Sequence, residues 1–469
     1  MTTEFAIDPA VLERTLQGAL RHGGDFAEVF AEDRRSASAH LDDGKIEEFT
    51  SGRSRGAGIR VVRGDTTGFA HTADLSEAGL ARAAAAAAAS ARGDAGGSTS
   101  IALTPQPGTE VPRGVELPET IEKLRKAELL ETADAAARAE GGAISQVGAS
   151  YADSRRRIIV ANSDGLLAED DVVRTRFVVS CVAVGDTGMQ TAQEGPGRSV
   201  GFEFFDTVDP ADVARIAARR ALTLLDARPA PSGRMPVVLK RGAGGVLFHE
   251  ACGHGLEADL VARDASVFTD RLGDRVAAPG VTLVDDGTYA REWGTFSIDD
   301  EGTPSQRNVL IEDGVLTDYM WDRLRAKKEG RPLQGNGRRE SYQVLPMVRM
   351  TNTFVLDGED DPDEIIRSTP NGIYCVQLGG GQVNTATGDF VFGITEAYLI
   401  ENGEITEPIR AAQLIGNGPQ CLTTIDAIGN DFDTWTGTCG KDGQGVPVSS
   451  GQPTLRLNGG LTIGGTAHG

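Results

Sequence analysis

The most constraining feature of this sequence is a histidine pair whose spacing does not suit a regular α-helix. His249 and His254 enclose the hexamer His-Glu-Ala-Cys-Gly-His, an HExxxH pattern, in a chain with only six histidines. The familiar zinc-protease motif has two histidines four positions apart on one helical face, with a glutamate beside the first as general base. Here the interval is five positions, which turns the second side chain roughly 140° away from the first. A regular helix would not direct both rings to one ion.

Two local changes of the backbone would bring the rings together. A π-type turn adds one residue to the helix and is frequent at functional sites. Alternatively, the helix opens at Gly253 or Gly255, where φ is nearly unrestricted. The apolar residues 246–248 lead into the hexamer, so we place it on a helix or at a strand-to-helix junction. The alternative interpretation is a buried helix with two hydrogen-bonded histidines and no metal.

Composition excludes several classes of protein. The net charge of -22 leaves no basic surface for phosphates, which argues against a nucleic-acid or anionic-membrane binder. No apolar run reaches the ~20 residues of a membrane span, and the N-terminus does not resemble a signal peptide. Five cysteines, an odd number with wide spacing, do not indicate a disulfide framework. We therefore expect a cytoplasmic protein.

The 469 residues are enough for two or three domains. We expect an N-terminal α+β domain over 1–100, a middle α+β domain over 115–228 and a β-rich domain over 233–469. Gly, Ser, Thr and Pro are concentrated in 93–118, which predicts the first linker. Turn signals such as Asp-Gly and Asn-Gly recur in the last part, typical of hairpins. The predicted fold class is α+β, ending in a mainly antiparallel β domain that carries the hexamer on a helix.

A zinc site needs at least a third protein ligand, and cysteine is the best candidate because thiolates bind Zn²⁺ well. Cys439 lies in the polar, glycine-rich stretch 436–444, which we interpret as a loop that presents its side chain. Cys252 is its rival, but it tends to point elsewhere if the two rings converge. Apolar surroundings suggest core positions for Cys181 and Cys375.

Several separate motifs, in one order along the chain, resemble the TldD/PmbA metalloprotease family. The similarity covers most of the chain and is densest after residue 235. The motifs that carry it are residues 248–259, 337–342, 346–353, 379–383, 388–390 and 439–444.

The resemblance implies a zinc peptidase with His249, His254 and Cys439 as ligands and Glu250 as base. It makes the C-terminal domain catalytic and implies a dimer that encloses the site. The partner would be a paralogous PmbA/TldE-like subunit that lacks the His-Glu pattern, or a second copy. Because this chain keeps every motif residue, it would be the catalytic member. Relatives often have a small apolar residue at Cys252, so Cys252 would not be a necessary ligand.

The family also suggests the substrates, which are unfolded proteins or peptides, including leader or precursor peptides. Gly379, Gly380 and Gly381 could let an extended peptide pair with a strand by main-chain hydrogen bonds, although they could equally only shape turns. Arg338 and Tyr342 could hold a carboxylate or an oxyanion near the metal. An ordinary surface ion pair is the alternative for Arg338.

Two other functions remain open. A non-catalytic partner or scaffold subunit could use the same ligands as a closed structural zinc site, which would make Glu250 dispensable. A cysteine hydrolase could use Cys439 with a histidine, and thiol alkylation but not chelation would inhibit it. The glutamate beside the first histidine favours the peptidase, in which it would accept a proton from the attacking water.

Overall fold

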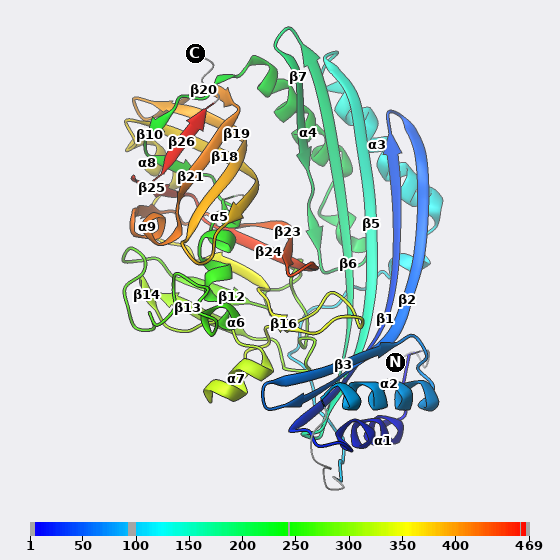
Figure 1. The fold of residues 1–469 in the computed structure, drawn as a ribbon. Helices are drawn as coiled ribbons and strands as arrows, with labels where there is room; N and C mark the ends of the chain where they lie inside the picture. The colour runs from blue at the N-terminus through cyan, green and yellow to red at the C-terminus, as the bar shows by residue number, and fades with distance from the viewer. Residues whose placement is uncertain (1–4, 92–99, 243, 460, 466–469) are drawn as a thin grey trace.

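The computed structural model describes residues 5–91, 100–242, 244–459 and 461–465, and it has the predicted α+β fold (Figure 1). Four long strands dominate the N-terminal half and run almost the full height of the molecule. They are β1 (Phe26–Asp42), β2 (Lys45–Arg63), β5 (Ile144–Asn162) and β6 (Leu166–Gly185).

Tight turns create the long hairpins. Asp43 and Gly44 join β1 to β2 with φ values of 46° and 78°, the left-handed conformation that two-residue hairpin turns require. The turn at 163–165 likewise joins β5 to β6, where Gly165 has a φ of 91°. Both turns were readable in the sequence from their Asp-Gly pairs.

The long hairpins share one sheet, because β1 pairs antiparallel with β5 from Glu28 opposite Asn162 to Asp42 opposite Gly148. The strand order is β3-β2-β1-β5-β6-β4, with β7 and β8 also paired to β6. One sheet therefore contains strands from both the predicted N-terminal domain (1–100) and the predicted middle domain (115–228). The division of the chain into three domains stays a proposal. Its shorter strands are β3 (Thr66–Thr72), β4 (Thr104–Pro105), β7 (Gly188–Glu194) and β8 (Gly197–Arg198).

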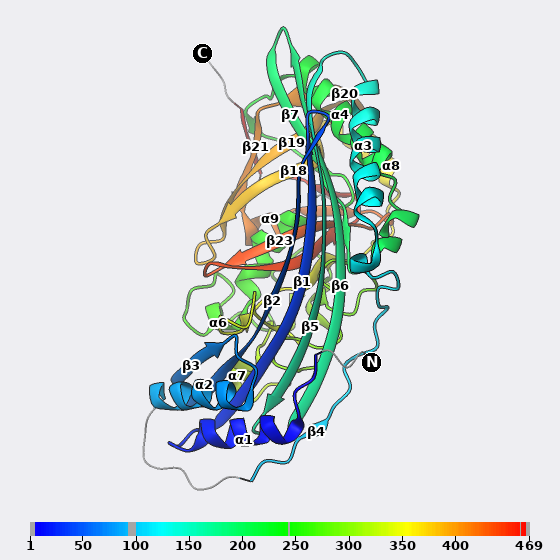
Figure 2. The same ribbon diagram turned by 90° about the vertical axis from the view of Figure 1, so that its right-hand side faces the viewer.

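Helices cover one face of this sheet, while the C-terminal half of the chain lies against the other (Figures 1 and 2). Asp8 and Asp209 cap two of these helices, each followed by a proline at the first helical position. In the described ranges, no helix combines the length and apolar character needed to cross a membrane. The helical elements are α1 (Pro9–Leu20), α2 (Glu77–Ser90), η1 (Pro118–Thr120), α3 (Lys123–Ala139), η2 (Phe202–Asp206) and α4 (Pro210–Asp226).

The C-terminal half is mostly sheet, as predicted. Its larger sheet has the order β10-β26-β21-β19-β18-β11-β25-β22, and β9 and β20 extend it beside β19. These strands are β9 (Arg228–Pro229), β10 (Gly233–Arg234), β11 (Val237–Leu239), β18 (Asn371–Val383), β19 (Asp389–Glu401), β20 (Glu404–Arg410), β21 (Ala412–Asn417), β22 (Ile425–Ile428), β25 (Leu455–Leu457) and β26 (Thr462–Gly465).

A second sheet, in the order β14-β13-β12-β17-β24-β23, carries the other side of the site. Its strands are β12 (Leu283–Asp286), β13 (Arg307–Glu312), β14 (Val315–Leu316), β17 (Asn352–Val355), β23 (Asp433–Lys441) and β24 (Gln444–Gln452). The remaining elements are α7 (Arg323–Glu329), β15 (Gly337–Arg338), β16 (Met347–Val348), α8 (Pro362–Arg367) and α9 (Gly418–Thr423).

Buried ion pairs fix the long sheet to the C-terminal half. Arg60 on β2 donates to Glu28 Oε2 at 2.9 Å and to Glu301 Oε1 at 2.6 Å, and Arg339 donates to Glu28 Oε1 at 2.5 Å. Burial alone would raise the pKa of Glu28, but the charges of Arg60 and Arg339 outweigh it and lower the pKa. These pairs hold the long sheet against the C-terminal half.

Candidate metal centre

The hexamer lies on a helix whose winding changes at the first histidine. The backbone N–H of His254 donates to the carbonyl of His249, the five-residue hydrogen bond of a π-helix. This confirms the first of the two predicted changes of the backbone, the π-type turn. The consecutive segments are α5 (Gly245–Phe248), the π-helical η3 (His249–Gly253), the 3₁₀-helical η4 (His254–Leu256) and α6 (Ala258–Val261).

Close packing explains the glycines around this segment. A Cβ atom at Gly253 would lie 2.3 Å from Met350 Sδ, which is far closer than real contacts. From the other side, a Cβ atom at Gly418 on α9 would lie 2.1 Å from the carbonyl oxygen of Ala251. The π-helical turn is therefore packed closely against Met350 and α9, and at Gly418 the close neighbour is a backbone atom, which cannot move aside as a side chain can.

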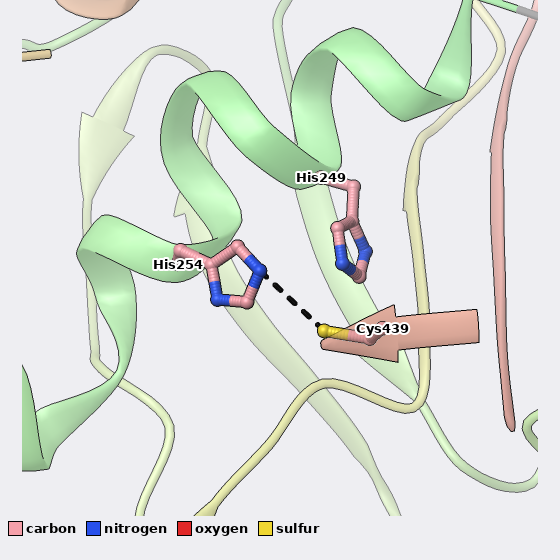
Figure 3. Close-up of side chains that lie close together, drawn as sticks. All are labelled: His249, His254 and Cys439. Carbon is pink, nitrogen blue, oxygen red and sulfur yellow. Dashed lines mark hydrogen bonds between the residues drawn. The ribbon is translucent and has the colours of Figure 1, made fainter. Parts of the chain in front are cut away.

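The π-helical turn brings both imidazole rings to the thiol of Cys439 (Figure 3). One ligand atom from each of the three residues lies within 4.8 Å of the others, and all three side chains are buried. Sγ of Cys439 is 3.4 Å from Nε2 of His254. The two rings are nearly perpendicular, at 86°, with centroids 5.1 Å apart. Three donors that can bind one ion thus converge from two distant segments.

Cys439 lies on a strand, where the sequence had indicated a loop. It belongs to β23 and is paired with Val446 of β24, and only Asp442 and Gly443 form the turn, with φ values of 48° and 76°. The polar Thr-Gly-Thr run resembles a loop, but pairing with β24 satisfies its backbone. Arg349, fully buried, donates to the carbonyl oxygen of Cys439 at 2.5 Å and so helps to fix the thiol.

The cluster favours a charged pair when no metal neutralises it. Burial lowers the pKa of His254, but the charge of Glu257 and hydrogen bonds with Cys439 and Glu257 raise it well above the usual value. Burial raises the pKa of Cys439, but His249 and His254 lower it far below that of a free thiol. A thiolate is the form of cysteine that binds metals, whereas His254 would have to release its proton when an ion binds.

Sequence reasoning missed the residues that support His254. Its Nδ1 atom lies 3.0 Å from Oε2 of the fully buried Glu257. Lys441 stands 2.9 Å from the same carboxylate oxygen and 2.7 Å from Asp259 Oδ1. A carboxylate behind a ligating histidine fixes the tautomer and orientation of the ring.

Spacing could have identified this support. Glu257 follows His254 by three positions, so it returns to the same side of a helical turn. Lys441 follows Cys439 by two positions, which places both side chains on one face of β23. Both residues lie within the motifs that carry the family resemblance, where we had given a role only to the histidines and the cysteine.

A cavity of about 530 Å³ opens beside the cluster, between the long sheet and the C-terminal half. His249 and Glu250 line it together with the glycines Gly379, Gly380 and Gly381 of β18. The side chain of Glu250 is 22% exposed, and its Oε2 lies 3.9 Å from Nε2 of His254. The structure therefore brings the proposed base, one proposed ligand and the glycine run to one cavity.

Arg338 and Tyr342 are placed elsewhere. Arg338 is buried and donates to the carbonyl oxygens of Met350, at 2.5 Å, and Pro447, at 2.7 Å. Tyr342 packs at the foot of the long sheet, edge-on to the ring of His71. Neither is among the described residues that line the cavity of His249 and Glu250. Tyr342 therefore contacts the long sheet, whereas these two bonds hold Arg338 within the C-terminal half.

The other cysteines lie outside the cluster. All five are free and buried, and the predicted core positions of Cys181 and Cys375 are confirmed. Cys252 donates from Sγ to the carbonyl oxygen of Phe248 at 3.0 Å, so its thiol is engaged within the helix. It is not part of the group of converging donors in the described chain.

Two imidazoles and a thiol that could hold a metal ion, with a carboxylate nearby at a cavity, are the side chains that metal-dependent hydrolases use. Models of the PmbA/TldA metallopeptidase family match the chain as domain 1 over 27–91, the central domain over 116–225 and the C-terminal domain over 232–465. The chain therefore belongs to the PmbA/TldD family of metallopeptidases, as the sequence motifs had indicated.

Individual relatives are consistent with this family assignment and with the fold. The chain is 40% identical over 451 residues to the "Metalloprotease TldD homolog" of Haemophilus influenzae, covering 94% of this chain and 93% of the relative. A solved Thermotoga maritima structure has a TM-score of 0.80 at 20% identity, covering 97% and 99% of the two chains. The structure of TldE from Thermococcus kodakarensis gives 0.78 at 18% identity, covering 97% and 100%. These two structures support the fold.

Proposed function

We propose that this chain is a zinc-dependent peptidase in which His249, His254 and Cys439 hold the zinc ion and Glu250 is the general base. The observation that carries the proposal is the convergence of the three donors, within 4.8 Å, beside a cavity that Glu250 lines. This arrangement combines a ligand set with access for a substrate.

The donor set fits zinc. Imidazole nitrogen and thiolate sulfur are the ligands that Zn²⁺ prefers, and three protein ligands with one open position characterise catalytic sites. A closed structural site would need a fourth protein ligand. In the described residues, the group of converging donors contains these three alone. We therefore favour the catalytic alternative over the scaffold subunit.

Glu250 would move the proton during hydrolysis. A bound zinc ion would supply Lewis acidity, which polarises a peptide carbonyl and makes water easier to deprotonate. Glu250 is free to accept the proton of that water, since it faces the cavity and lies one position after His249. Its protonated carboxyl group would then pass the proton to the leaving amine.

The cavity suits an extended peptide. A Cβ atom at Gly380 would meet nothing within 4 Å, so the backbone of β18 is open to a close approach there. A peptide that lies along this strand could be held by main-chain hydrogen bonds, which place little demand on its sequence. Unfolded proteins and peptides, including leader or precursor peptides, are therefore the substrates we propose.

We also propose that the active assembly is a dimer that encloses the site. Its second subunit would be a paralogous PmbA/TldE-like chain or another copy of this chain, which the family suggests. Enclosure would exclude folded proteins from the cavity. The cytoplasm is the compartment we propose, since all five cysteines are free in the structure.

The test combines metal analysis with proteolysis. Zinc content would be measured by elemental analysis, and cleavage of denatured casein by gel and mass spectrometry, for the wild type, Glu250→Ala and Glu404→Ala. Glu404 is an exposed residue of β20 and serves as the matched control. We expect stoichiometric zinc in all three proteins and cleavage by the wild type and Glu404→Ala only.

Other outcomes would change the assignment. Zinc without cleavage, even after the paralogous subunit is added, would favour a structural site. Absence of zinc would contradict the proposal. Inhibition by iodoacetamide but not by a chelator would favour the cysteine hydrolase, for which the 3.4 Å approach of Cys439 to His254 is the relevant observation.

A further inference from the structure

Arg176 on β6 is a cation without a counter-ion in the cavity of the proposed active site. It lines this cavity together with His249 and Glu250. Its Nε atom is buried and has no hydrogen-bond partner, and no ion pair involves it in the described part of the chain. Burial lowers the pKa of Arg176, and no acidic neighbour offsets this. A buried Nε–H without a hydrogen-bond partner is costly, and such groups gather at binding sites.

A neighbouring arginine shows the contrast. Arg174, two positions earlier on β6, donates to the carbonyl oxygens of Trp293 at 2.8 Å and Thr295 at 3.2 Å. Those bonds give Arg174 a structural role at the junction of the two halves. Among the residues that the structure describes, Nε of Arg176 has no such partner.

The carboxylates of the cavity are otherwise occupied. Glu194 lines it too, but its Oε2 atom lies 3.1 Å from Arg220, which also donates to Glu396 at 2.6 Å. Glu250 lies beside His254 as the proposed base. The protein therefore leaves Arg176 free for a negative group that arrives with a ligand.

The backbone keeps the guanidinium group accessible. A Cβ atom at Gly195 would lie 3.6 Å from Nη2 of Arg176, so glycine leaves this side of the arginine uncovered.

Gly197 is paired with Arg176 across β8 and β6. Its N–H donates to Oγ1 of Thr436 at 3.1 Å, and the Thr436 hydroxyl donates back to its carbonyl at 3.0 Å.

This link connects β6, through β8, to the strand that carries Cys439, and it sets a scale for the separation of Arg176 from the metal cluster. Thr436 precedes Cys439 by three positions on β23, which corresponds to about 10 Å along a strand. An extended peptide also advances about 3.3 Å per residue. A group bound at Arg176 would thus lie roughly three residues along the peptide from the bond at the metal.

We propose that Arg176 binds a carboxylate of the peptide substrate, two to four residues from the scissile bond. Guanidinium and carboxylate groups match in a bidentate geometry that few other ligands of a peptidase offer. The carboxylate is either the free C-terminus or an acidic side chain. This inference rests on the proposed function, because it assumes that the cavity holds a peptide.

Binding without turnover tests the inference. Zinc-loaded Glu250→Gln protein would be titrated calorimetrically with N-acetylated (Gly-Ala)₃ as the free acid and as the C-terminal amide. Amidated versions with one alanine replaced by glutamate or by glutamine would complete the set. We expect the carboxylate peptides to bind about 10- to 100-fold more tightly than their neutral partners. A preference for the free acid identifies the C-terminus, and a preference for glutamate identifies a side chain.

Three further variants on this background assign the effect. Arg176→Gln should abolish the preference, and Arg176→Lys should retain part of it. Arg215→Gln, at a 41% exposed side chain on α4, should retain all of it. Melting temperature and zinc content would verify that each variant is folded. Equal or undetectable binding of charged and neutral peptides, or a preference that survives in Arg176→Gln, would overturn the inference.

The proposed function is tested separately on the same peptides. If the wild type cleaves none of them while Arg176 still selects carboxylates in the binding assay, the peptidase proposal fails and the carboxylate site stands. If the wild type cleaves charged and neutral peptides equally, the carboxylate site fails and the peptidase stands.

Discussion

Nδ1 of His254 and Oε2 of Glu257 lie 3.0 Å apart in the interior of the protein. Glu257 is fully buried, and the ammonium group of Lys441 stands 2.9 Å from the same oxygen. Burial raises the pKa of Glu257, but the charges of His254 and Lys441 lower it below its ordinary value. The carboxylate therefore stays ionised and orients the imidazole whose other nitrogen faces Cys439.

Glu257→Gln should weaken zinc binding about 10- to 100-fold, because the amide cannot supply the charge that aligns His254 and increases its basicity. Competition with a chelator of known affinity would measure the change. Glu404→Gln on the surface is the control and should bind zinc like the wild type. Equal affinities for both variants would show that Glu257 serves Lys441 rather than the metal site.

Cys439→Ala should lose stoichiometric zinc, because the cluster would keep only two of its three donors. Cys252→Ala removes a thiol that lies between the histidines in sequence but donates to the carbonyl oxygen of Phe248. This control should retain zinc and lose only packing, at a cost of about 1 kcal/mol. Elemental analysis of both proteins decides between the two cysteines, and zinc loss in Cys252→Ala alone would reverse our ligand assignment.

Gly418→Ala should destabilise the protein and disturb the metal site. The new methyl group would lie 2.1 Å from the carbonyl oxygen of Ala251, and a backbone atom cannot move aside as a side chain can. We expect a loss of about 1–3 kcal/mol, as for other overpacked sites, together with reduced zinc content.

Gly18→Ala is the matched control for that substitution. Gly18 lies inside α1, where a Cβ atom would meet nothing within 4 Å. The same change should stabilise the protein there by up to about 1 kcal/mol, since alanine is the better helix former. Melting temperatures that shift in the same direction for both variants would contradict the packing argument.

The sequence predicted the local features of the fold and the site that depend on neighbouring residues. The five-position interval between His249 and His254 required an irregular helix, and a π-helical turn is present. Asp-Gly pairs marked the hairpin turns because few other residues adopt positive φ values. The candidate ligand Cys439 was selected by its polar surroundings, and the structure places it beside both rings.

Features that depend on distant residues were not predictable. Nothing near Glu28 indicates that β1 pairs with β5, more than a hundred positions later, to form one sheet. Arg338 and Tyr342 belong to a conspicuous motif, but the motif fills the junction between the halves rather than the cavity. Cys439 was assigned to a loop because the partner strand β24, which satisfies its backbone, is not apparent from composition.

Asp322 carries the last prediction, on the pH dependence of stability. It caps α7 by accepting a hydrogen bond from the N–H of Arg325 at 2.8 Å, and it is buried. Burial and the charge of Glu301 raise the pKa of Asp322 from 3.8 to about 7. The folded protein therefore retains this proton at pH values where the unfolded chain has released it.

The sign of the effect follows from linkage. Below about pH 4, Asp322 is protonated in both states and contributes nothing. As the pH rises from 4 to 7, the unfolded state binds fewer protons than the folded state, so the free energy of unfolding falls. The loss amounts to at most about 4 kcal/mol, and above pH 7 it is constant.

Asp322→Asn should remove this loss and keep the helix cap, because asparagine caps helices as well as aspartate does. The variant should gain stability over the wild type as the pH rises from 4.5 to 7.5, which denaturant midpoints would measure. Asp361→Asn, at the 67% exposed cap of α8, is the control and should differ from the wild type equally at both pH values. A constant difference for Asp322→Asn as well would show that the folded protein tolerates its charge at this buried position.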